Sequence, residues 1–267
     1  MRFVRCCASP PAAARPLSQV PSPPHPPPVL VPRRPAGGEG LPPSLWLNAA
    51  LLVDKPVGYT SFDVCARLRG ALRTKKIGHA GTLDPFATGL LIICTGRGTK
   101  WVDTFQAQEK RYSGVLRLGQ ATPSYDCETP VSLSLPWEHL TDAQLTAAAA
   151  AFVGDILQVP PMYSAIKQQG VALYKLARAG ETVERPPRSL HVRSFDVSRQ
   201  PGSQDVAFSV QCSKGTYIRS LAHDLGAALG SAAHLTVLRR EAIGEHCVAD
   251  AWPLEELLAA GRAGQAL

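Results

Sequence analysis

Long hydrophobic runs are absent from this chain of 267 residues. The longest uncharged stretch with helical character, residues 145–154, is short and rich in alanine, whereas a helix that spans a bilayer needs about 18 to 20 consecutive apolar residues. We therefore expect no membrane association. With 45% hydrophobic and 18% charged residues, the composition also excludes collagen and coiled-coil classes and is typical of a globular protein.

Paired cysteine motifs are absent too. The seven cysteines include no C-x-x-C pair and are odd in number, which argues against a zinc ribbon or a disulfide framework and favours a reducing compartment. The sequence contains no His, Cys and Asp cluster with metal-ligand spacing, no Walker loop, no G-x-G-x-x-G and no G-x-S-x-G. We therefore expect no metal, no nucleotide cofactor and no serine-hydrolase chemistry.

Acidic residues are scarce relative to basic ones. The chain has 28 Lys and Arg against 21 Asp and Glu, a net charge of +7 and a pI near 9.2, which favours a polyanionic partner. Part of this excess is local, because residues 1–43 carry five arginines and one glutamate, +4 in all, and leave +3 for the remainder.

The N-terminal segment 1–43 contains 13 of the 24 prolines and shows no apolar periodicity. Because proline lacks the N–H that helices and sheets need, we expect this segment to be disordered, and residues 44–267 to form the folded domain. Rich in arginine and nearly free of acids, it has the charge pattern of an organelle transit peptide, and its Ala/Pro-rich character favours a chloroplast over a mitochondrion. The alternative is a solvated basic extension.

Hydrophobic patterning in the rest of the chain alternates irregularly between strands and helices. It predicts strands at 51–54, 89–94, 112–118, 189–197, 205–212 and 235–238, and helices at about 61–72, 99–105, 141–153 and 218–229. Strand 89–94 is apolar on both faces and is expected to be central. Residues 78–88 are expected to form a loop. This order predicts an α+β fold with a mixed, largely antiparallel sheet flanked by helices.

Residues 159–188 stand apart from this alternation. Proline pairs lie near both ends, and five basic residues, a glycine and a short helical stretch lie between or beside them. We predict an insertion that leaves the sheet and is basic enough to touch phosphate. The alternative is a solvated surface hairpin.

Asp84 is the strongest candidate for a catalytic group. It lies in a stretch with three glycines, before Pro85, which biases Asp84 toward an extended conformation beside the predicted central strand. A carboxylate held rigidly at such a place can act as a nucleophile. Considered alone, Asp before Pro is more often a turn former, and His79 in the same stretch is more often a structural histidine.

Two further clusters fit the chemistry of a nucleic-acid enzyme. Tyr217 and Arg219 follow a glycine turn at the start of a predicted helix, and an arginine near a carboxylate keeps that carboxylate ionised. Tyr112 follows two cations, Lys110 and Arg111, a composition suited to base stacking and phosphate neutralisation. The alternatives are a solvated helix face for the arginine and a half-buried strand residue for Tyr112.

The run GHAGTLDPFATGLL at 78–91 resembles the signature of TruB-type tRNA pseudouridine synthases. Seven more blocks are similar in order and spacing, so that the resemblance covers about residues 47–245. These blocks are Leu52–Pro56, Gly98–Lys100, Lys110–Tyr112, Arg117–Gly119, Gln158–Lys167, Cys212–Arg219 and Leu238–Arg240. The resemblance implies a pseudouridine synthase fold whose 159–188 insertion grips RNA. It also implies isomerisation of uridine 55 in the tRNA T loop, with no cofactor.

The resemblance also implies roles for individual residues. Asp84 matches the catalytic aspartate, Arg219 the arginine paired with it, and Tyr217 a tyrosine that takes part in proton abstraction from the sugar. A second set is implied to bind the substrate. These residues are Tyr112, which stacks on the flipped base, His79, which fills the space it vacates, Leu238 in the uracil pocket, and Lys55, Lys100 and Asp126.

The sequence departs from the family pattern in two places. Asp126 is kept, but the Asp-Ala-x-Gly turn usual around it is replaced by Asp-Cys-Glu-Thr. Only about 20 residues follow Gly244, so we expect no C-terminal RNA-binding domain of the PUA type. This leaves two alternatives open, the same chemistry on organellar mRNA or rRNA, and an RNA chaperone that only binds. We expect a monomer, because nothing in the sequence indicates a larger assembly.

Overall fold

The computed structural model describes residues 26–31 and 43–264. One mixed sheet of 11 strands runs through the molecule. Its main path is β1 (Val29–Val31), β2 (Ala49–Lys55), β4 (Thr88–Thr95), β13 (Ala233–Ile243), β5 (Lys110–Leu118), β12 (Asp205–Cys212), β11 (Arg188–Arg199) and β8 (Gly154–Gln158). Antiparallel pairs predominate, while β4 pairs with β13, and β1 with β2, in parallel. The predicted α+β class with a mixed, largely antiparallel sheet is confirmed.

Short strands complete the edges of this sheet. β3 (Ile77–His79) pairs with β4, β14 (His246–Cys247) with β13, and β15 (Trp252–Pro253) with β2. Two small hairpins lie outside it, β6 (Gln120–Ala121) with β7 (Leu133–Ser134), and β9 (Lys167–Gln168) with β10 (Val171–Ala172).

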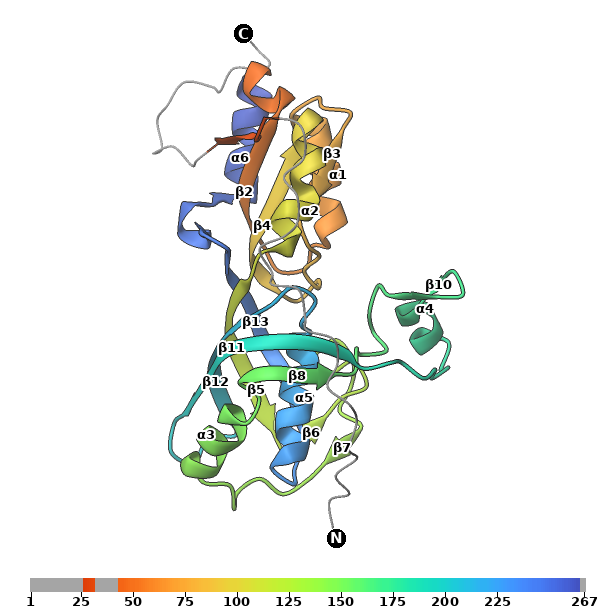
Figure 1. Cartoon of the computed structure of the whole chain (residues 1–267), viewed down its shortest axis with the longest axis vertical. Coiled ribbons are helices and arrows are strands. Elements are labelled where there is room, and N and C mark those ends of the chain that lie inside the picture. Colours follow the sequence, from red (N-terminus) through yellow and green to blue (C-terminus); the bar gives the residue numbers. More distant parts are fainter. Residues whose placement is uncertain (1–25, 32–42, 265–267) are drawn as a thin grey trace.

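The helices divide the molecule into two lobes (Figure 1). In the upper lobe α1 (Ser61–Ala71), α2 (Val102–Ala107) and α6 (Leu254–Ala263) surround β2 and β4, and in the lower lobe α3 (Asp142–Ala150) and α5 (Ile218–Ala228) accompany β5, β11 and β12. Strand β13 passes from one lobe to the other. The remaining helical turns are α4 (Leu173–Arg178), η1 (Pro43–Leu47), η2 (Gly96–Trp101) and η3 (Val248–Asp250). No helix within the described ranges is long and apolar enough to cross a membrane.

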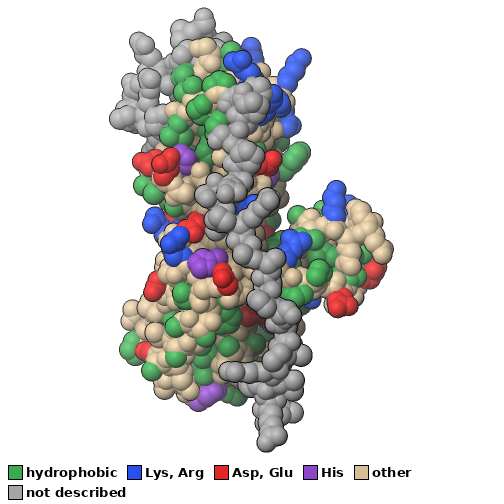
Figure 2. Space-filling model, viewed as in Figure 1, with side chains coloured by type: hydrophobic (Ala, Val, Ile, Leu, Met, Phe, Trp, Pro, Cys, Tyr) green, Lys and Arg blue, Asp and Glu red, His purple; other side chains and the backbone are tan. Residues whose placement is uncertain are grey.

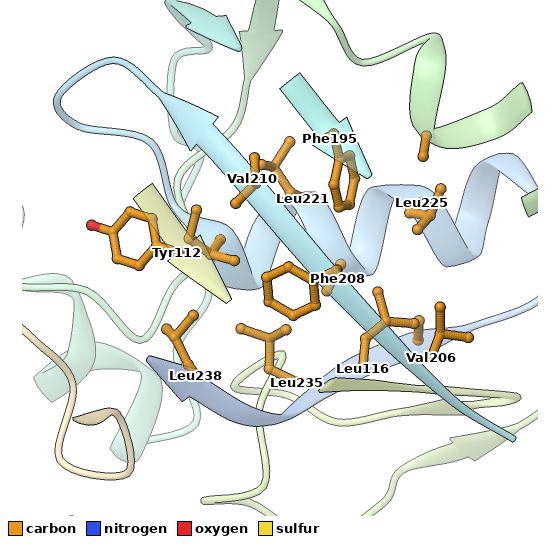
Figure 3. Close-up of a cluster of buried hydrophobic side chains, with 14 of the residues drawn as sticks. Tyr112, Leu116, Phe195, Val206, Phe208, Val210, Leu221, Leu225, Leu235 and Leu238 are labelled. Carbon is orange, nitrogen blue, oxygen red and sulfur yellow. The ribbon is translucent and has the colours of Figure 1, made fainter. Parts of the chain in front are cut away.

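Each lobe is stabilised by hydrophobic clusters of its own. The largest lies in the lower lobe, where side chains of β5, β12 and β13 pack against α5 around Phe208. Figure 3 shows Tyr112 and Leu238 at one end of this cluster, with the phenolic oxygen of Tyr112 pointing away from the other labelled side chains. In the upper lobe, Val64 and Leu68 of α1 pack on one face of β2 and β4, and Phe105 of α2 packs on the other.

The prediction of a loop at 78–88 is wrong for its first two residues, because Gly78 and His79 belong to strand β3. β13 pairs with β4 only at Thr88 and Gly89. β3 covers the far end of that same edge, at residues 93–95. Backbone groups that would otherwise be left unpaired are thereby satisfied, a requirement that local sequence patterning does not reveal.

Part of the segment predicted to be disordered lies in the sheet. Strand β1 pairs with residues 49–51 of β2. The Val31 side chain is buried, and its carbonyl accepts a 3.2 Å hydrogen bond from Trp252 Nε1, while Pro26 O accepts one of 3.1 Å from Trp101 Nε1. The prediction failed here because three apolar residues suffice for an edge strand when a buried partner strand has a free edge. The rest of the predicted transit segment, residues 1–25 and 32–42, lies outside the described residues.

The insertion at 159–188 stands off from the side of the molecule and carries β9, β10 and α4 (Figure 1). Its predicted departure from the sheet is thus observed. Strand β8, which precedes it, and helix α6 were not predicted from patterning. Gln158 ends β8 and Arg188 begins β11, and these two residues pair with each other, so the insertion leaves and re-enters the sheet at one point.

Candidate active site

A cleft of about 640 Å³ lies between the two lobes and the insertion. This volume is within the range typical of small-molecule and nucleotide sites, about 300 to 1,000 Å³. Asp84 lines it together with Tyr112, Tyr217, Arg219 and Leu238. The structure therefore brings five of the nine predicted site residues into one cavity.

The loop that carries Asp84 is clamped from α1. The Ser61 hydroxyl accepts a 2.9 Å hydrogen bond from Leu83 N and donates one of 3.3 Å to Leu83 O. Thr60 caps the same helix through a reciprocal capping box with Asp63, which anchors this first turn. The backbone immediately before Asp84 is thus fixed by the start of a helix.

Two buried cations clamp the same loop from the sheet. Lys55 Nζ donates to Pro85 O at 3.3 Å and to Tyr59 O at 2.7 Å, and Arg240 donates to Gly81 O at 3.1 Å and to Leu90 O at 2.7 Å. Neither side chain is more than 1% exposed. Each therefore uses its donors on backbone carbonyls and shapes the site from within.

Gly89 makes the close approach of β4 to β13 possible. Its φ of +104° lies in the region that favours glycine, and an added Cβ would lie 2.3 Å from Arg240 O. A side chain at this position would separate the two strands and displace Arg240.

Arg219 contacts the Asp84 carboxylate through two nitrogens, one of which donates a hydrogen bond. Arg219 Nε lies 2.9 Å from Asp84 Oδ2, and Nη2 donates to Asp84 Oδ1 at 3.1 Å. The guanidinium also donates to Tyr163 O at 2.8 Å and to Ser124 O at 3.1 Å, and only 4% of its side chain is exposed. One hydrogen bond and a close ionic contact from the same guanidinium thus fix the direction of the carboxylate and favour its charged form.

Asp126 lies behind this pair and does not line the cleft. Its side chain is fully buried, its Oδ2 lies 3.4 Å from Arg219 Nη1, and its Oδ1 accepts from Glu128 N at 2.9 Å. The placement differs from the predicted contact with substrate, because a carboxylate with no exposed surface cannot reach a ligand. Asp126 instead shares the Arg219 charge with Asp84.

Burial and charge act in opposite directions on the reactive carboxylate. Burial raises the pKa of Asp84 above its usual range, and so does Asp126, while Arg219 and Lys55 lower it. Burial also lowers the pKa of Lys55 to about 8, against the opposing charge of Asp84. The 32% exposure of the Asp84 side chain shows that its outer face is open to the cleft.

Tyr112 and Leu238 form an apolar wall of the cleft. They lie on the neighbouring strands β5 and β13 and are 9% and 5% exposed. Burial raises the pKa of the Tyr112 phenol, and nearby Arg240 opposes that rise, so the ring remains neutral at physiological pH. An aromatic face beside an aliphatic side chain is suited to hold a planar base.

Gln158 at the end of β8 holds the backbone of Tyr217. Gln158 Oε1 accepts from Tyr217 N at 2.8 Å, and Nε2 donates to Tyr217 O at 3.1 Å. Tyr217 immediately precedes α5, and burial raises the pKa of its phenol. The positioning by Gln158 was not predicted, although a polar amide before a proline pair was a visible signal.

His79 and Lys100 do not line the cleft. His79 is half-buried on β3, where burial lowers its pKa, and Lys100 is exposed at the end of η2. Four further side chains line the cleft although the sequence predicted no cleft role for them. They are Arg178 and Tyr174 of α4, Glu128 and Lys214. Among the described residues, no group of three His, Cys, Asp or Glu side chains is arranged to hold a metal ion.

Comparisons with known proteins agree on one family. Residues 69–218 match the model of the TruB family pseudouridylate synthase N-terminal domain. Over 211 residues the chain is 49% identical to tRNA pseudouridine synthase B of Opitutus terrae, covering 79% of this chain and 87% of that protein. It is 47% identical over 208 residues to the protein of the same name from Flavobacterium johnsoniae, covering 75% and 90% of the two chains.

Solved structures share the fold. A chain in the crystal structure of a Cbf5–Nop10–Gar1 complex superposes with a TM-score of 0.62 at 26% identity. That similarity covers 86% of this chain and 64% of the other. A chain in a structure of an H/ACA RNP bound to a substrate RNA has a TM-score of 0.58 at 25% identity.

Proposed function

The chain belongs to the TruB family of pseudouridylate synthases, and from this premise we propose that it isomerises uridine 55 in the T loop of tRNA. The observation that carries the proposal is the geometry of Asp84. Arg219 holds this carboxylate from behind, while its outer face is open to a cleft large enough for one nucleotide. The relatives named tRNA pseudouridine synthase B support tRNA as the substrate.

The reaction exchanges one bond of the substrate for another. The bond between ribose C1′ and uracil N1 breaks, a bond between C1′ and C5 forms, and a proton leaves C5 while N1 gains one. Asp84 supplies the nucleophile, attacking C1′ or the uracil ring, so that the base detaches, rotates and rejoins through carbon. Because the balance closes within the substrate and one carboxylate, the reaction requires no cofactor.

The target base must leave its stack before it can meet Asp84. Flipping a nucleotide out of the T loop costs a few kcal/mol, which contacts in the pocket must offset. We propose that Tyr112 stacks on the flipped uracil and that Leu238 packs against its edge, consistent with their positions in the cleft wall. We propose that Tyr217 takes part in proton abstraction from the sugar as the base detaches, with that proton returned to the sugar when the bond between C1′ and C5 forms.

The insertion provides the far wall of the cleft. Tyr163, Tyr174 and Arg178 line the cleft from this segment, and Arg178 is exposed. We propose that the insertion contacts the T stem-loop backbone. It leaves and re-enters the sheet at one point, and Arg219 and Ser220 of α5 also hold its first residues through backbone carbonyls.

Conversion of a synthetic T-arm stem-loop tests this function. We expect the protein to produce pseudouridine at the T-loop uridine, mapped chemically at nucleotide resolution, and Asp84→Asn to produce none while still binding the RNA. Asp103→Asn is the matched control, because Asp103 is an exposed aspartate of α2 outside the cleft. Binding without conversion by the parent protein would support the RNA-chaperone alternative, and conversion only of mRNA or rRNA would support the alternative targets.

We also propose import into an organelle, with a chloroplast favoured by the composition of the N-terminal segment. Fusion of residues 1–45 to a fluorescent protein tests this in plant and animal cells. Accumulation of the fusion in plastids supports the proposal, and a diffuse signal in both cell types contradicts it.

A further inference from the structure

A second basic surface lies on the upper lobe, away from the catalytic cleft. Residues 64–77 contain five basic residues and no acid. Arg67 is engaged, with its guanidinium 4.7 Å from the centroid of the Tyr59 ring and 3.5 Å from Glu255. The other four are exposed. They are Arg69, Arg73, Lys75 and Lys76.

Arg97 adds a fifth exposed cation, because Gly96 N donates to Lys76 O at 2.8 Å and joins the two segments. Within the described part of the chain, none of these five side chains forms an ion pair with an acid. Figure 2 shows Lys and Arg side chains gathered over the end of the upper lobe that carries α1 and β3. Unpaired cations concentrated on one surface attract a polyanion.

Helix α1 connects this surface to the active site. Its first turn holds the Asp84 loop through Ser61, and its last turn leads into the basic residues. A helix of 11 residues is about 16 Å long, so a strand of RNA that leaves the cleft along α1 reaches the basic end within a few nucleotides.

The exposed face of α1 has the composition of an RNA-binding surface. Phe62, Ala66 and Arg69 follow one another at spacings of four and three residues and share one helical face. Phe62 lines the cleft and is 66% exposed, unusual for a large aromatic side chain. Gly70 beside them is open, since a Cβ added there meets no atom within 4 Å. An aromatic ring for stacking, small residues for close approach and arginines for phosphate therefore follow in order.

Arg73 occupies a position that favours glycine. It follows the C-cap of α1 with a φ of +47°, a left-handed conformation in which helices usually place glycine. An arginine is strained there, and no packing in the described structure compensates, because its side chain is exposed. The exposed Arg73 side chain adds its charge to the basic surface.

We propose that this α1 basic face, consisting of Phe62, Ala66, Arg69, Arg73, Lys75 and Lys76, binds the phosphodiester backbone of the substrate RNA outside the flipped nucleotide. The inference rests on the proposed function for the identity of the polyanion. It adds a positioning surface on the upper lobe, separate from the insertion, so that two parts of the protein hold the RNA.

Neutralising two arginines tests the proposal with full-length tRNA transcript. For Arg69→Gln with Arg73→Gln we expect KM to rise about tenfold and kcat at saturation to stay unchanged. We also expect the slope of log kcat/KM against log salt to become shallower by about 2, close to one for each lost phosphate contact. Arg193→Gln with Arg262→Gln removes the same charge from other exposed positions and should change neither quantity.

The Arg73→Gly variant distinguishes an effect on RNA binding from an effect on protein stability. Glycine relieves the left-handed strain, so Tm should rise, while the lost cation should raise KM. An unchanged KM and salt slope in both the double variant and Arg73→Gly would overturn the proposal. So would unchanged RNA kinetics combined with weakened binding to vesicles of anionic phospholipid. If the parent protein converts no uridine, filter binding of the transcript by the same variants still decides the question.

Discussion

The Asp84 carboxylate is held by a buried network of charges. Arg219 is 4% exposed and contacts two carboxylates, Asp84 in front and Asp126 behind. The arrangement holds Asp84 in one direction while burial raises its pKa. Reactivity at this site therefore depends on the geometry of the guanidinium as well as on its charge.

Arg219→Lys tests that dependence. Lysine keeps the charge but cannot contact both oxygens of Asp84 while also donating to Tyr163 O and Ser124 O, so we expect kcat to fall by a factor of about 100 to 1,000, with tRNA affinity within about threefold. Rapid-quench kinetics under saturating enzyme measures the chemical step. Arg193→Lys, which breaks the bidentate pair with Glu109 on the surface, is the matched control and should retain full activity. Equal losses in both variants would contradict a specific role for the Arg219 fork.

The lowered pKa of Lys55 predicts how the stability of the protein changes with pH. Burial lowers the pKa of Lys55 in the folded protein to about 8, from the usual lysine value of 10.5. Between these values the unfolded chain holds a proton that the folded chain has lost, so stability rises with pH across this window. We expect the difference in unfolding free energy between the parent and Lys55→Met to shift by roughly 2 kcal/mol in favour of the parent from pH 7.5 to 10. Urea denaturation measures it, and a flat or falling difference would contradict the assignment.

At the scale of elements, the edge of β2 explains why part of the N-terminal segment is folded. β1 covers residues 49–51 of that edge and β15 covers residues 53 and 54. Two indole N–H groups, from Trp101 and Trp252, donate to carbonyls of residues 26 and 31. Residues 26–31 thereby supply hydrogen-bond partners for the edge of β2 and for both indole N–H groups.

Truncation separates these contributions. A protein that begins at residue 26 should unfold at the same urea midpoint as the full chain. One that begins at residue 43 should lose about 2 to 4 kcal/mol, because the β2 edge, the buried Trp252 donor and the half-buried Trp101 donor lose their partners. The contradictory result is equal stability of the two truncated proteins. If a transit segment is removed on import, the same reasoning places its cleavage before Pro26.

Elements with strong local patterns could be predicted from the sequence. Strand β12 begins at Asp205 and ends at Cys212 as predicted, and α5 begins at Ile218, because strict alternation and an amphipathic stripe are local signals. β3, β8 and β1 could not, since short strands form where a neighbouring strand offers a free edge, which depends on the assembled sheet. For the same reason the clamps made by Arg240, Ser61 and Gln158 appear only in three dimensions.

At the scale of the whole molecule, the cleft lies where three parts meet. The upper lobe contributes Asp84, the lower lobe contributes Tyr112 and Arg219, and the insertion contributes Tyr163 and Tyr174. The insertion joins the sheet at one point. Removal of the insertion should therefore weaken RNA binding more than it lowers the stability of the fold.

Replacing residues 167–180 with a short Gly-Ser turn tests this division of roles. We expect KM for the T-arm stem-loop to rise at least tenfold, since the cleft loses Tyr174 and Arg178, and the urea midpoint to remain close to that of the parent. Alanine at Gln200, an exposed residue that follows β11, provides a control for surface changes. An unchanged KM would show that the insertion does not grip the substrate.

The most direct test of the central claim is the release of tritium from tRNA labelled at C5 of uridine, measured in a single turnover. Formation of the carbon–carbon bond at C5 must release that label, whereas binding alone cannot. We expect the parent protein and Asp103→Asn to release one tritium per tRNA, that of uridine 55, and Asp84→Asn to release none above background. Release by Asp84→Asn at the parental rate would contradict the assignment of Asp84 as the nucleophile.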